Sequence, residues 1–470
     1  SSAASDVYKR QGFFPGVSAG WIFGREDFIK EAIPVMSFGK LRASYGINGN
    51  ASGIGAYTLQ GSYGSSNSNG SFNYNGNTSY LITELPNPNL RWEKTATFEV
   101  GADLSFFANR LNTNLTYYNR LTSDKYAALS FPTSTGFSSV TNNNGEFRNQ
   151  GIEIELSGKI IDSKDWTWSA SGNIAFNKNK IVSLPDNGME RNRINAFQVY
   201  TGNGDEKKWV GGQQEGQEPG ILYLYQADGI YRSYDEIPAN LVRKYGSRTY
   251  YGPEAWNKLT AEQQNATTNF PIQPGDTKFH DVNGDDVIDE FDKVKVGATS
   301  PRWTGGFNTT LRWKNFQLYG RFDYALGFWL YENSGTQSTT PWFMGCYQGT
   351  YNTPTMYYDT WSESNPNAKY PRYLFADQNG KNNYIASTMF AYRGDYLAIR
   401  EISLSYSLPE SVAKMLKMQR AEVSITGQNL GYITGAKNVG SPEANPKDNG
   451  AVGQGYSLPR TILFGVNLTF

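Results

Sequence analysis

Apolar and polar residues alternate along the last ten residues of the chain. Ile462, Phe464, Val466, Leu468 and Phe470 would lie on one face of a strand, and the residues between them are mostly small or polar. A period of two with one apolar row is typical of a strand that contacts an apolar medium on one side only. We therefore predict a strand over residues 461–470.

The same alternation recurs through most of the chain, for example over 98–106 and 166–176. If roughly ten residues make one strand, the pattern predicts about thirteen antiparallel strands. They are expected near 15–24, 38–48, 90–106, 111–125, 144–160, 166–182, 203–215, 219–232, 301–313, 316–331, 396–408, 421–434 and 461–470.

The connections between these segments differ in length. Tight turns are expected at 107–110, 161–165, 216–218 and 314–315, and moderate connections at 25–37 and 409–420, the second with a helical turn. Long connections are expected at 49–89, 126–143, 183–202, 233–300, 332–395 and 435–460. Such long loops, with no core of their own, are unusual in a compact soluble domain. The pattern favours an all-β, antiparallel transmembrane β-barrel with long extracellular loops and short periplasmic turns over a soluble sandwich.

Composition agrees with this fold class. Hydrophobic residues make up 38% of the 470 residues, and no run approaches the roughly 20 apolar residues of a membrane helix. Aromatic residues reach 15%, as expected for a barrel with aromatic girdles, and Trp92, Trp166, Trp168 and Trp313 fall near strand ends. Lys plus Arg equals Asp plus Glu, at 43 each, so nothing indicates a nucleic-acid partner.

Several motifs in a fixed order carry a family resemblance. They are Gly20–Ile22, Phe38–Asn50, Leu90–Lys94, Arg148–Glu153, Tyr225–Tyr231, Asp281–Asp285, Tyr396–Arg400, Gln428–Leu430 and Ser457–Arg460. In this order they resemble the barrel of SusC/RagA-type TonB-dependent outer-membrane transporters. Residues 12–470 resemble the C-terminal part of such a barrel, which has roughly 22 strands. Residues 1–11 are an unassigned leader or a foreign junction.

The resemblance implies a function in the Gram-negative outer membrane. Members import oligosaccharides or peptides, and glycan import is one form of this nutrient uptake. A SusD-type surface lipoprotein would act as a lid, and TonB would act through a plug and N-terminal part that no residue here matches. Phe470 resembles the assembly signal of outer-membrane barrels, which the barrel-assembly machinery reads, and the apolar rows would contact membrane lipid. Because the first strands of the barrel are missing, we expect an open or abnormally closed sheet with an exposed edge at 461–470.

One segment has the spacing of a calcium loop. Oxygen ligands fall at positions 1, 3, 5, 9 and 12, and a backbone carbonyl is available at position 7. The candidate ligands of Ca²⁺ are Asp281, Asn283, Asp285, Val287, Asp289 and Asp292. Position six is Asp286 instead of the usual glycine, and Asp292 is shorter than the usual glutamate. The alternative is an Asx-rich turn held by its own hydrogen bonds.

Aromatic residues in the 332–395 loop are candidate substrate contacts, because aromatic faces stack on sugar rings or hold peptide side chains. They are Trp342, Tyr347, Tyr357, Tyr358 and Trp361. The alternative is that they pack the loop against its neighbours or against a lid. No enzyme is expected, because the single histidine, His280, and the single cysteine, Cys346, offer no pair for nucleophilic or zinc chemistry. A passive porin and a soluble carbohydrate-binding β protein are the other functional alternatives.

Overall fold

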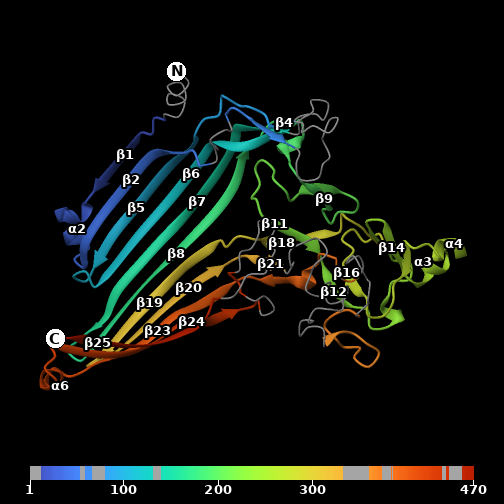
Figure 1. Cartoon of the computed structure of the whole chain (residues 1–470). Helices are drawn as coiled ribbons and strands as arrows, with labels where there is room; N and C mark the ends of the chain where they lie inside the picture. Colours follow the sequence, from blue (N-terminus) through green and yellow to red (C-terminus); the bar gives the residue numbers. More distant parts are fainter. Residues whose placement is uncertain are drawn as a thin grey trace.

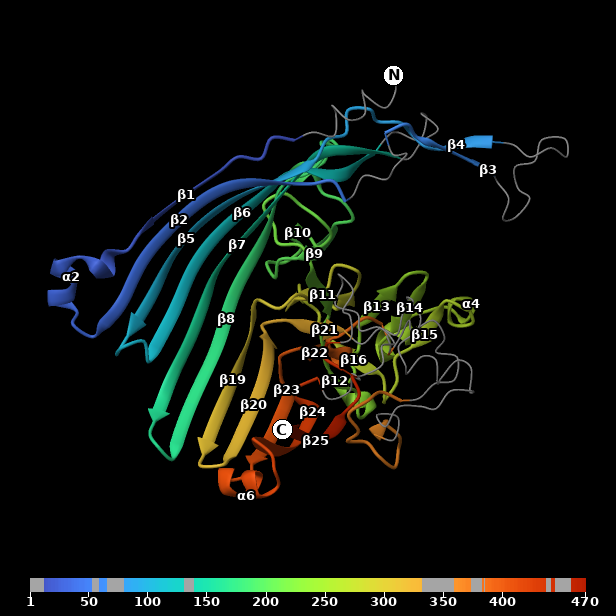
Figure 2. The ribbon, with the colours of Figure 1, turned by 60° about the vertical axis from the view of Figure 1, so that its left-hand side comes forward.

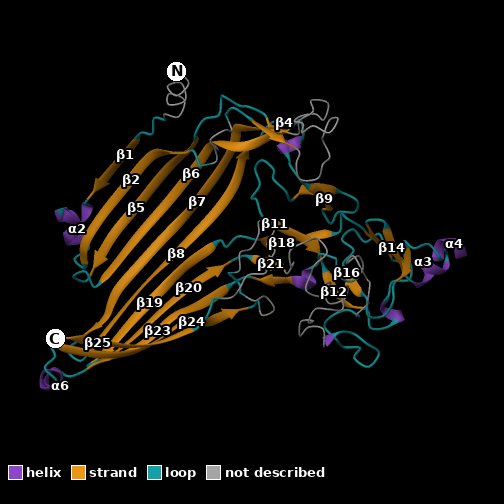
Figure 3. Ribbon diagram, in the orientation of Figure 1, coloured by secondary structure: helices purple, strands orange, loops and turns teal. Residues whose placement is uncertain are grey.

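The structure, a computed structural model, describes most of the chain. The described residues are 12–52, 59–65, 80–130, 139–331, 359–372, 383, 385–436, 441–443 and 458–470. Figure 3 shows strands as the main element, with short helices at the rims. No helix in these ranges is long and apolar enough to cross a membrane.

Within the described residues, eleven antiparallel strands form one curved sheet, in the spatial order β1-β2-β5-β6-β7-β8-β19-β20-β23-β24-β25 (Figure 1). Their bounds are β1 Gly16–Trp21, β2 Met36–Asn50, β5 Glu93–Phe106, β6 Leu111–Ser130, β7 Ser139–Asp162, β8 Trp166–Ser183, β19 Trp303–Trp313, β20 Phe316–Leu326, β23 Tyr396–Ser407, β24 Arg420–Thr434 and β25 Thr461–Thr469. Among the described residues β1 and β25 do not pair with each other, so the sheet is open, as expected. The antiparallel β fold is confirmed.

The strand count departs from the prediction of about thirteen. Segments 203–215 and 219–232 lie outside the main sheet, in the connection between β8 and β19. There β10 (Lys207–Val210) pairs with β9 (Phe197–Tyr200), and β11 (Ile221–Tyr225) pairs with β18 (Lys293–Ala298). The turn predicted at 216–218 therefore joins no two strands of the main sheet. A period of two in the apolar residues predicts that one face of a strand is buried. It does not predict whether lipid or a second protein core covers that face.

This connection, together with segments near 329–331 and 383–393, forms a small external module (Figure 2). Its other strands are β12 Ala227–Ile230, β13 Val242–Tyr245, β14 Arg248–Tyr251, β15 Asn269–Pro271, β16 Thr277–Phe279, β17 Val287–Ile288, β21 Trp329–Tyr331 and β22 Ala391–Arg393, with helices α3 Pro253–Asn257 and α4 Ala261–Gln264. Two buried clusters hold it, one around Tyr225 and Ile288 and one around Leu222 and Phe390. The expectation of long loops without a core is therefore wrong for this region.

The module and the short turns lie at opposite rims of the sheet (Figure 2). The predicted turns at 107–110, 161–165 and 314–315 connect neighbouring strands. Helix α2 (Asp27–Ala32) lies in the connection at 25–37, and helix α6 (Glu410–Met415) forms the helical turn predicted in 409–420. A further hairpin, β3 (Ser62–Ser65) with β4 (Tyr80–Glu84), lies between β2 and β5.

One face of the main sheet carries an exposed apolar belt. Its rows are exposed although they are rich in large apolar residues, among them Val100, Leu156, Phe307, Leu404 and Phe464. Trp303 and Trp313 mark its two edges on β19, where Trp303 contacts Phe176 and Trp313 stacks on Trp166. Ten residues at ~3.3 Å each, tilted by about 40°, span ~25 Å along the barrel axis, the height of the apolar band of an outer-membrane barrel. An exposed belt of this height contradicts a soluble protein.

Candidate functional site: the polar wall and the external module

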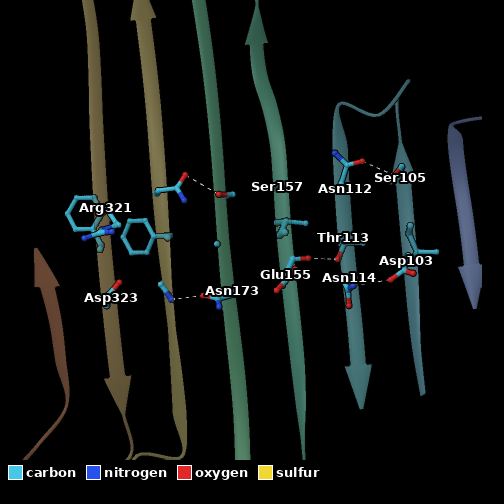
Figure 4. Close-up of a pocket in the computed structure, with 18 of the residues that line it drawn as sticks. Asp103, Ser105, Asn112, Thr113, Asn114, Glu155, Ser157, Asn173, Arg321 and Asp323 are labelled. Carbon is cyan, nitrogen blue, oxygen red and sulfur yellow. Dashed lines mark hydrogen bonds between the residues drawn. The ribbon is translucent and has the colours of Figure 1, made fainter. Parts of the chain in front are cut away.

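The opposite face of the sheet is polar and hollowed. A depression of about 590 Å³ crosses the middle of β5, β6, β7, β8, β19 and β20 (Figure 4). Its polar lining residues are Asp103, Ser105, Asn112, Asn114, Glu155, Ser157, Ser171, Asn173, Asn308, Arg321 and Asp323. Strand register places them in rows, since Asn114 pairs with Asp103 on one side and with Glu155 on the other. Charged and amide side chains in such rows suit a wet lumen.

Arg42 anchors one side of this polar wall. Its Nε donates to Asp103 Oδ1 at 3.4 Å and its Nη2 to Asn114 Oδ1 at 2.9 Å, with a further bond to Thr116. The side chain crosses β5 at Gly101, where a Cβ atom would lie 2.8 Å from the guanidinium carbon. Glycine at this position therefore lets an arginine on β2 reach β6.

Arg400 anchors the other side and ties down the segment after β24. A register shift between Ile399 and Glu401 leaves Arg400 as an extra residue of β23, in a β-bulge. Its Nε donates to Asp323 Oδ2 at 2.6 Å, and its Nη1 donates to Glu443 Oε2 at 3.0 Å. Tyr432 donates to the same Glu443 oxygen at 2.8 Å. The bulge therefore fixes Glu443 against the wall.

Two charged side chains in the depression make no ion pair of this kind among the described residues. The Glu155 carboxylate and the Arg321 guanidinium are exposed, and neither makes an ion pair with a described residue. They lie on β7 and β20, at opposite sides of Asn173 and Asn308 (Figure 4). Charges that have no partner in the wall are available to a passing solute.

A buried ion pair joins two distant segments of the external module. Asp276, which is 0% exposed, accepts from Arg372 Nε at 2.7 Å and from Asn383 Nδ2 at 3.1 Å. Its second oxygen accepts from the Gln273 backbone at 3.0 Å. The contact links the connection before β19 with the connection after β21.

The predicted calcium loop lies on the surface of this module, beside the β9–β10 hairpin. Asp281 accepts from the backbone N–H groups of Gly284 and Asp286 at 2.8 Å each, and Asp285 accepts from Val287 at 2.8 Å. These are the bonds of an Asx-rich turn. Asp286 has a φ of 61°, so an aspartate adopts the left-handed conformation that glycine usually supplies at position six.

Two groups in the loop differ from an ordinary turn. Asp292 is 0% exposed and accepts from Val282 and Asp289 backbone N–H groups at 2.9 and 2.7 Å. Burial raises the pKa of its carboxyl to about 6, against the lowering effect of those two donors and with a smaller contribution from Asp289 and Asp281. Asn283 Oδ1 is buried without a hydrogen-bond partner. In the described part of the chain, no three His, Cys, Asp or Glu side chains already converge as metal ligands.

The other predicted site residues fall in different places. Trp342, Tyr347, Tyr357 and Tyr358, with Cys346, lie outside the described residues. Trp361 packs on Gly275, where a Cβ atom would lie 2.4 Å from its ring, and its Nε1 is buried without a partner. The His280 ring lies 3.2 Å from Asp228 Oδ2, and its backbone N–H donates to the Gln226 carbonyl at 3.0 Å. Phe470 is 75% exposed at the end of the apolar row of β25.

Sequence reasoning named no residue of the polar wall as a site. The bulge at Arg400 did leave a signal, because apolar residues alternate as Leu397 and Ile399 and then resume at Ile402. The step of three breaks the period and marks an inserted residue. The crossing of β5 by Arg42 has no comparable signal, since it depends on which strands are neighbours.

Comparison with known proteins shows which proteins the chain resembles in sequence. No protein-family model matches the chain. It is 28% identical over 467 residues to the TonB-dependent receptor P3 of Formosa agariphila, covering 97% of this chain and 42% of that protein. It is 26% identical over 477 residues to the TonB-dependent receptor SusC of Bacteroides thetaiotaomicron, covering 98% of this chain and 40% of that protein.

A solved structure shares the fold. The structure of the RagAB peptide transporter matches with a TM-score of 0.67 and 22% identity over 97% of this chain and 43% of that chain. The chain is thus similar in sequence to TonB-dependent receptors, and it shares the β-barrel fold of a transporter of the Gram-negative outer membrane. In sequence the chain is similar to SusC, and in fold it is similar to the RagAB structure. It spans less than half the length of the curated relatives it matches.

Proposed function

We propose that the protein containing this chain imports oligosaccharides or peptides across the outer membrane in a TonB-dependent manner. A single observation carries the proposal: the polar wall is hollowed and holds the unpaired charges of Glu155 and Arg321, while the external module stands at one rim. Such a wall can bind a polar solute weakly and release it, with no bond chemistry. The relatives are named as receptors and transporters, and none as an enzyme.

A SusD-type lipoprotein is proposed as the lid over the module, and TonB as the source of energy. Support for the partners comes from the match to SusC and to the RagAB structure. Trp361 stays a prediction as a substrate contact. Phe470 stays a prediction as the assembly signal.

Uptake experiments test the transport proposal. Cells that carry the full-length protein should accumulate labelled oligosaccharides or peptides, and removal of TonB should abolish the uptake. Uptake that persists without TonB would instead support a passive porin. Arg321→Gln and Glu155→Gln should each lower uptake roughly two- to fivefold through weaker attraction of charged solutes. Lys417→Gln, an exposed charge at the rim of short turns, is the matched control and should leave uptake unchanged.

We propose in addition that the 281–292 segment binds Ca²⁺ and stiffens the external module. The ligand spacing supports this, as do the buried Asp292, whose pKa is raised to about 6, and the unpartnered Asn283 Oδ1. A divalent cation would supply a positive counter-charge that stabilises the ionised form of the buried Asp292 carboxylate. Asp281, Asn283, Asp285, Asp289 and Asp292 would contribute side-chain oxygens and Val287 its carbonyl.

Calcium should therefore protect the module against local unfolding. At about 10 mM Ca²⁺ and an affinity in the range of extracellular sites, the gain is about 1–3 kcal/mol. Hydrogen exchange of the β13 and β17 amides, with Ca²⁺ and with a chelator, measures it. Asp281→Ala should remove the gain, whereas Asp235→Ala, an exposed carboxylate in the same module, should keep it. Equal exchange with Ca²⁺ and with chelator would refute the calcium proposal.

A further inference from the structure

The apolar face of the sheet has a groove of its own, distinct from the polar depression. It has a volume of about 710 Å³ and runs over β7, β8 and β19. Gly158 and Ala170 form its floor, and Leu111, Leu156, Ile160 and Trp168 stand along its sides. We call these six residues the outer groove.

Strand register explains why the groove exists. Leu111 pairs with Gly158, Gly158 with Ala170 and Ala170 with Thr309, so small side chains occupy one row across three strands. In the neighbouring row, Leu156 and Phe307 lie on either side of Gly172 and supply bulky side chains at the two ends. A row of small residues between large ones leaves a channel that a flat sheet face would not have.

The position of the groove matches one leaflet of the membrane. On β19 it extends from the level of Leu311, which pairs with Trp168, to the level of Gly305, which pairs with Tyr324. Six residues at ~3.3 Å, tilted by about 40°, correspond to ~15 Å of depth, half of a ~30 Å hydrocarbon core. The groove therefore has the reach of one lipid chain.

The mouth of the groove, at the rim of short turns, is basic. Arg110 precedes Leu111, and its Nη2 donates to the carbonyls of Lys159 and Ile160 at 3.3 and 3.1 Å, which fixes the guanidinium beside the groove. The turn residues around it are Arg110, Lys159, Lys164 and Lys314 against Asp162 and Asp165, four cations and two carboxylates. Lys159 lies 3.8 Å from Asp162, so Arg110 is the better placed cation for an added anion.

We propose that the outer groove is a binding site for an anionic phospholipid. One acyl chain lies over Gly158 and Ala170, and the phosphate contacts Arg110 at the periplasmic rim. Hydrocarbon is the occupant because the groove opens within the apolar belt, and an anionic head group is selected because the mouth carries excess positive charge. The site lies on the lipid-facing side of the wall, away from the transport path.

Lipid immobilisation in vesicles tests the proposal. The full-length protein is reconstituted in phosphatidylcholine vesicles that contain spin-labelled phosphatidylglycerol or spin-labelled phosphatidylcholine. We expect the wild type to hold the anionic lipid more tightly. Ala170→Leu should weaken its retention about tenfold, because roughly two methylene groups lose their contact with the floor. Ala102→Leu adds the same bulk to the same face outside the groove and should have no effect.

A second variant distinguishes the contribution of the lipid head group from that of the acyl chain. Arg110→Gln should reduce the preference for phosphatidylglycerol over phosphatidylcholine roughly two- to fivefold and leave chain immobilisation in place. If Ala170→Leu fails to form a heat-modifiable barrel, Ala170→Val, which adds two methyl groups, takes its place. Equal retention in the Ala170 and Ala102 variants would overturn the groove, and equal binding of both lipids by the wild type would overturn the anionic selectivity.

Discussion

Replacement of Asp276 by alanine is expected to destabilise the external module by about 3 kcal/mol. The carboxylate is fully buried and accepts from the Arg372 guanidinium, the Asn383 amide and the Gln273 backbone. Its removal takes away an acceptor that three donors share, at a site where Asp276 and Asn383 are fully buried. Because β16 begins at Thr277, the loss falls directly on the strand that pairs with β12.

Hydrogen exchange measures this loss as local opening, without unfolding of the barrel. The β12 and β16 amides should exchange roughly a hundredfold faster in Asp276→Ala, whereas those of β6 and β7 should keep their rates. Arg372→Met in the same background should recover part of the loss, since it removes a cation that has lost the Asp276 carboxylate. Asp235→Ala controls for charge. A change below about 0.5 kcal/mol in Asp276→Ala would contradict the prediction.

Replacement of Arg400 by methionine is expected to release the segment around Glu443 and cost about 2–3 kcal/mol. The Arg400 side chain is only 14% exposed, and it separates the carboxylates of Asp323 and Glu443. Without the cation, the two carboxylates face each other across the wall, and Glu443 keeps its contacts with the Tyr432 and Tyr396 hydroxyls and with Ser441. Limited proteolysis near residue 443 and exchange of the 441–443 amides would both increase.

A double-mutant cycle separates the pair from the fold. Arg400→Met, Glu443→Gln and their combination should give a coupling energy of about 1–3 kcal/mol. Arg393→Ala is the matched control, because Arg393 is 55% exposed and its bond to Asp395 at 2.7 Å should contribute less than about 1 kcal/mol. Strictly additive effects of the Arg400 and Glu443 changes would show that the two side chains do not hold each other.

Most strands of the main sheet could be located in the sequence because a lipid-facing strand alternates apolar and polar residues. Other segments of the chain do not keep this period of two over the length of a strand. Strands such as β19 and β25 follow directly from their rows of apolar residues. The prediction failed for 219–232, where Leu222 and Leu224 belong to the apolar run Ile221–Tyr225 and face the module core. Alternation identifies a strand with one face that is shielded from water, but it does not show whether lipid or a protein core covers that face.

The candidate sites divide in the same way. The 281–292 segment was visible because all its candidate Ca²⁺ ligands lie within twelve residues, so spacing alone carries the hypothesis. The Asp276–Arg372 pair and the Arg42–Asn114 bond span 96 and 72 residues. No local pattern relates such residues, because their contact depends on which strands are neighbours and on the glycine that lets a side chain cross.

By itself the sequence determined that this protein is a membrane-facing β wall with alternating rows, tight turns at one rim and long connections at the other. These properties are local, since side-chain direction and turn geometry depend on a few neighbouring residues. Only the tertiary structure decided which strands share the main sheet, that the connection from β8 to β19 folds around its own core, and that Arg400 lies in a bulge. Strand register and long-range packing decide these features. The free energy gained by burial against a distant segment depends on both segments, so it cannot be read from either one alone.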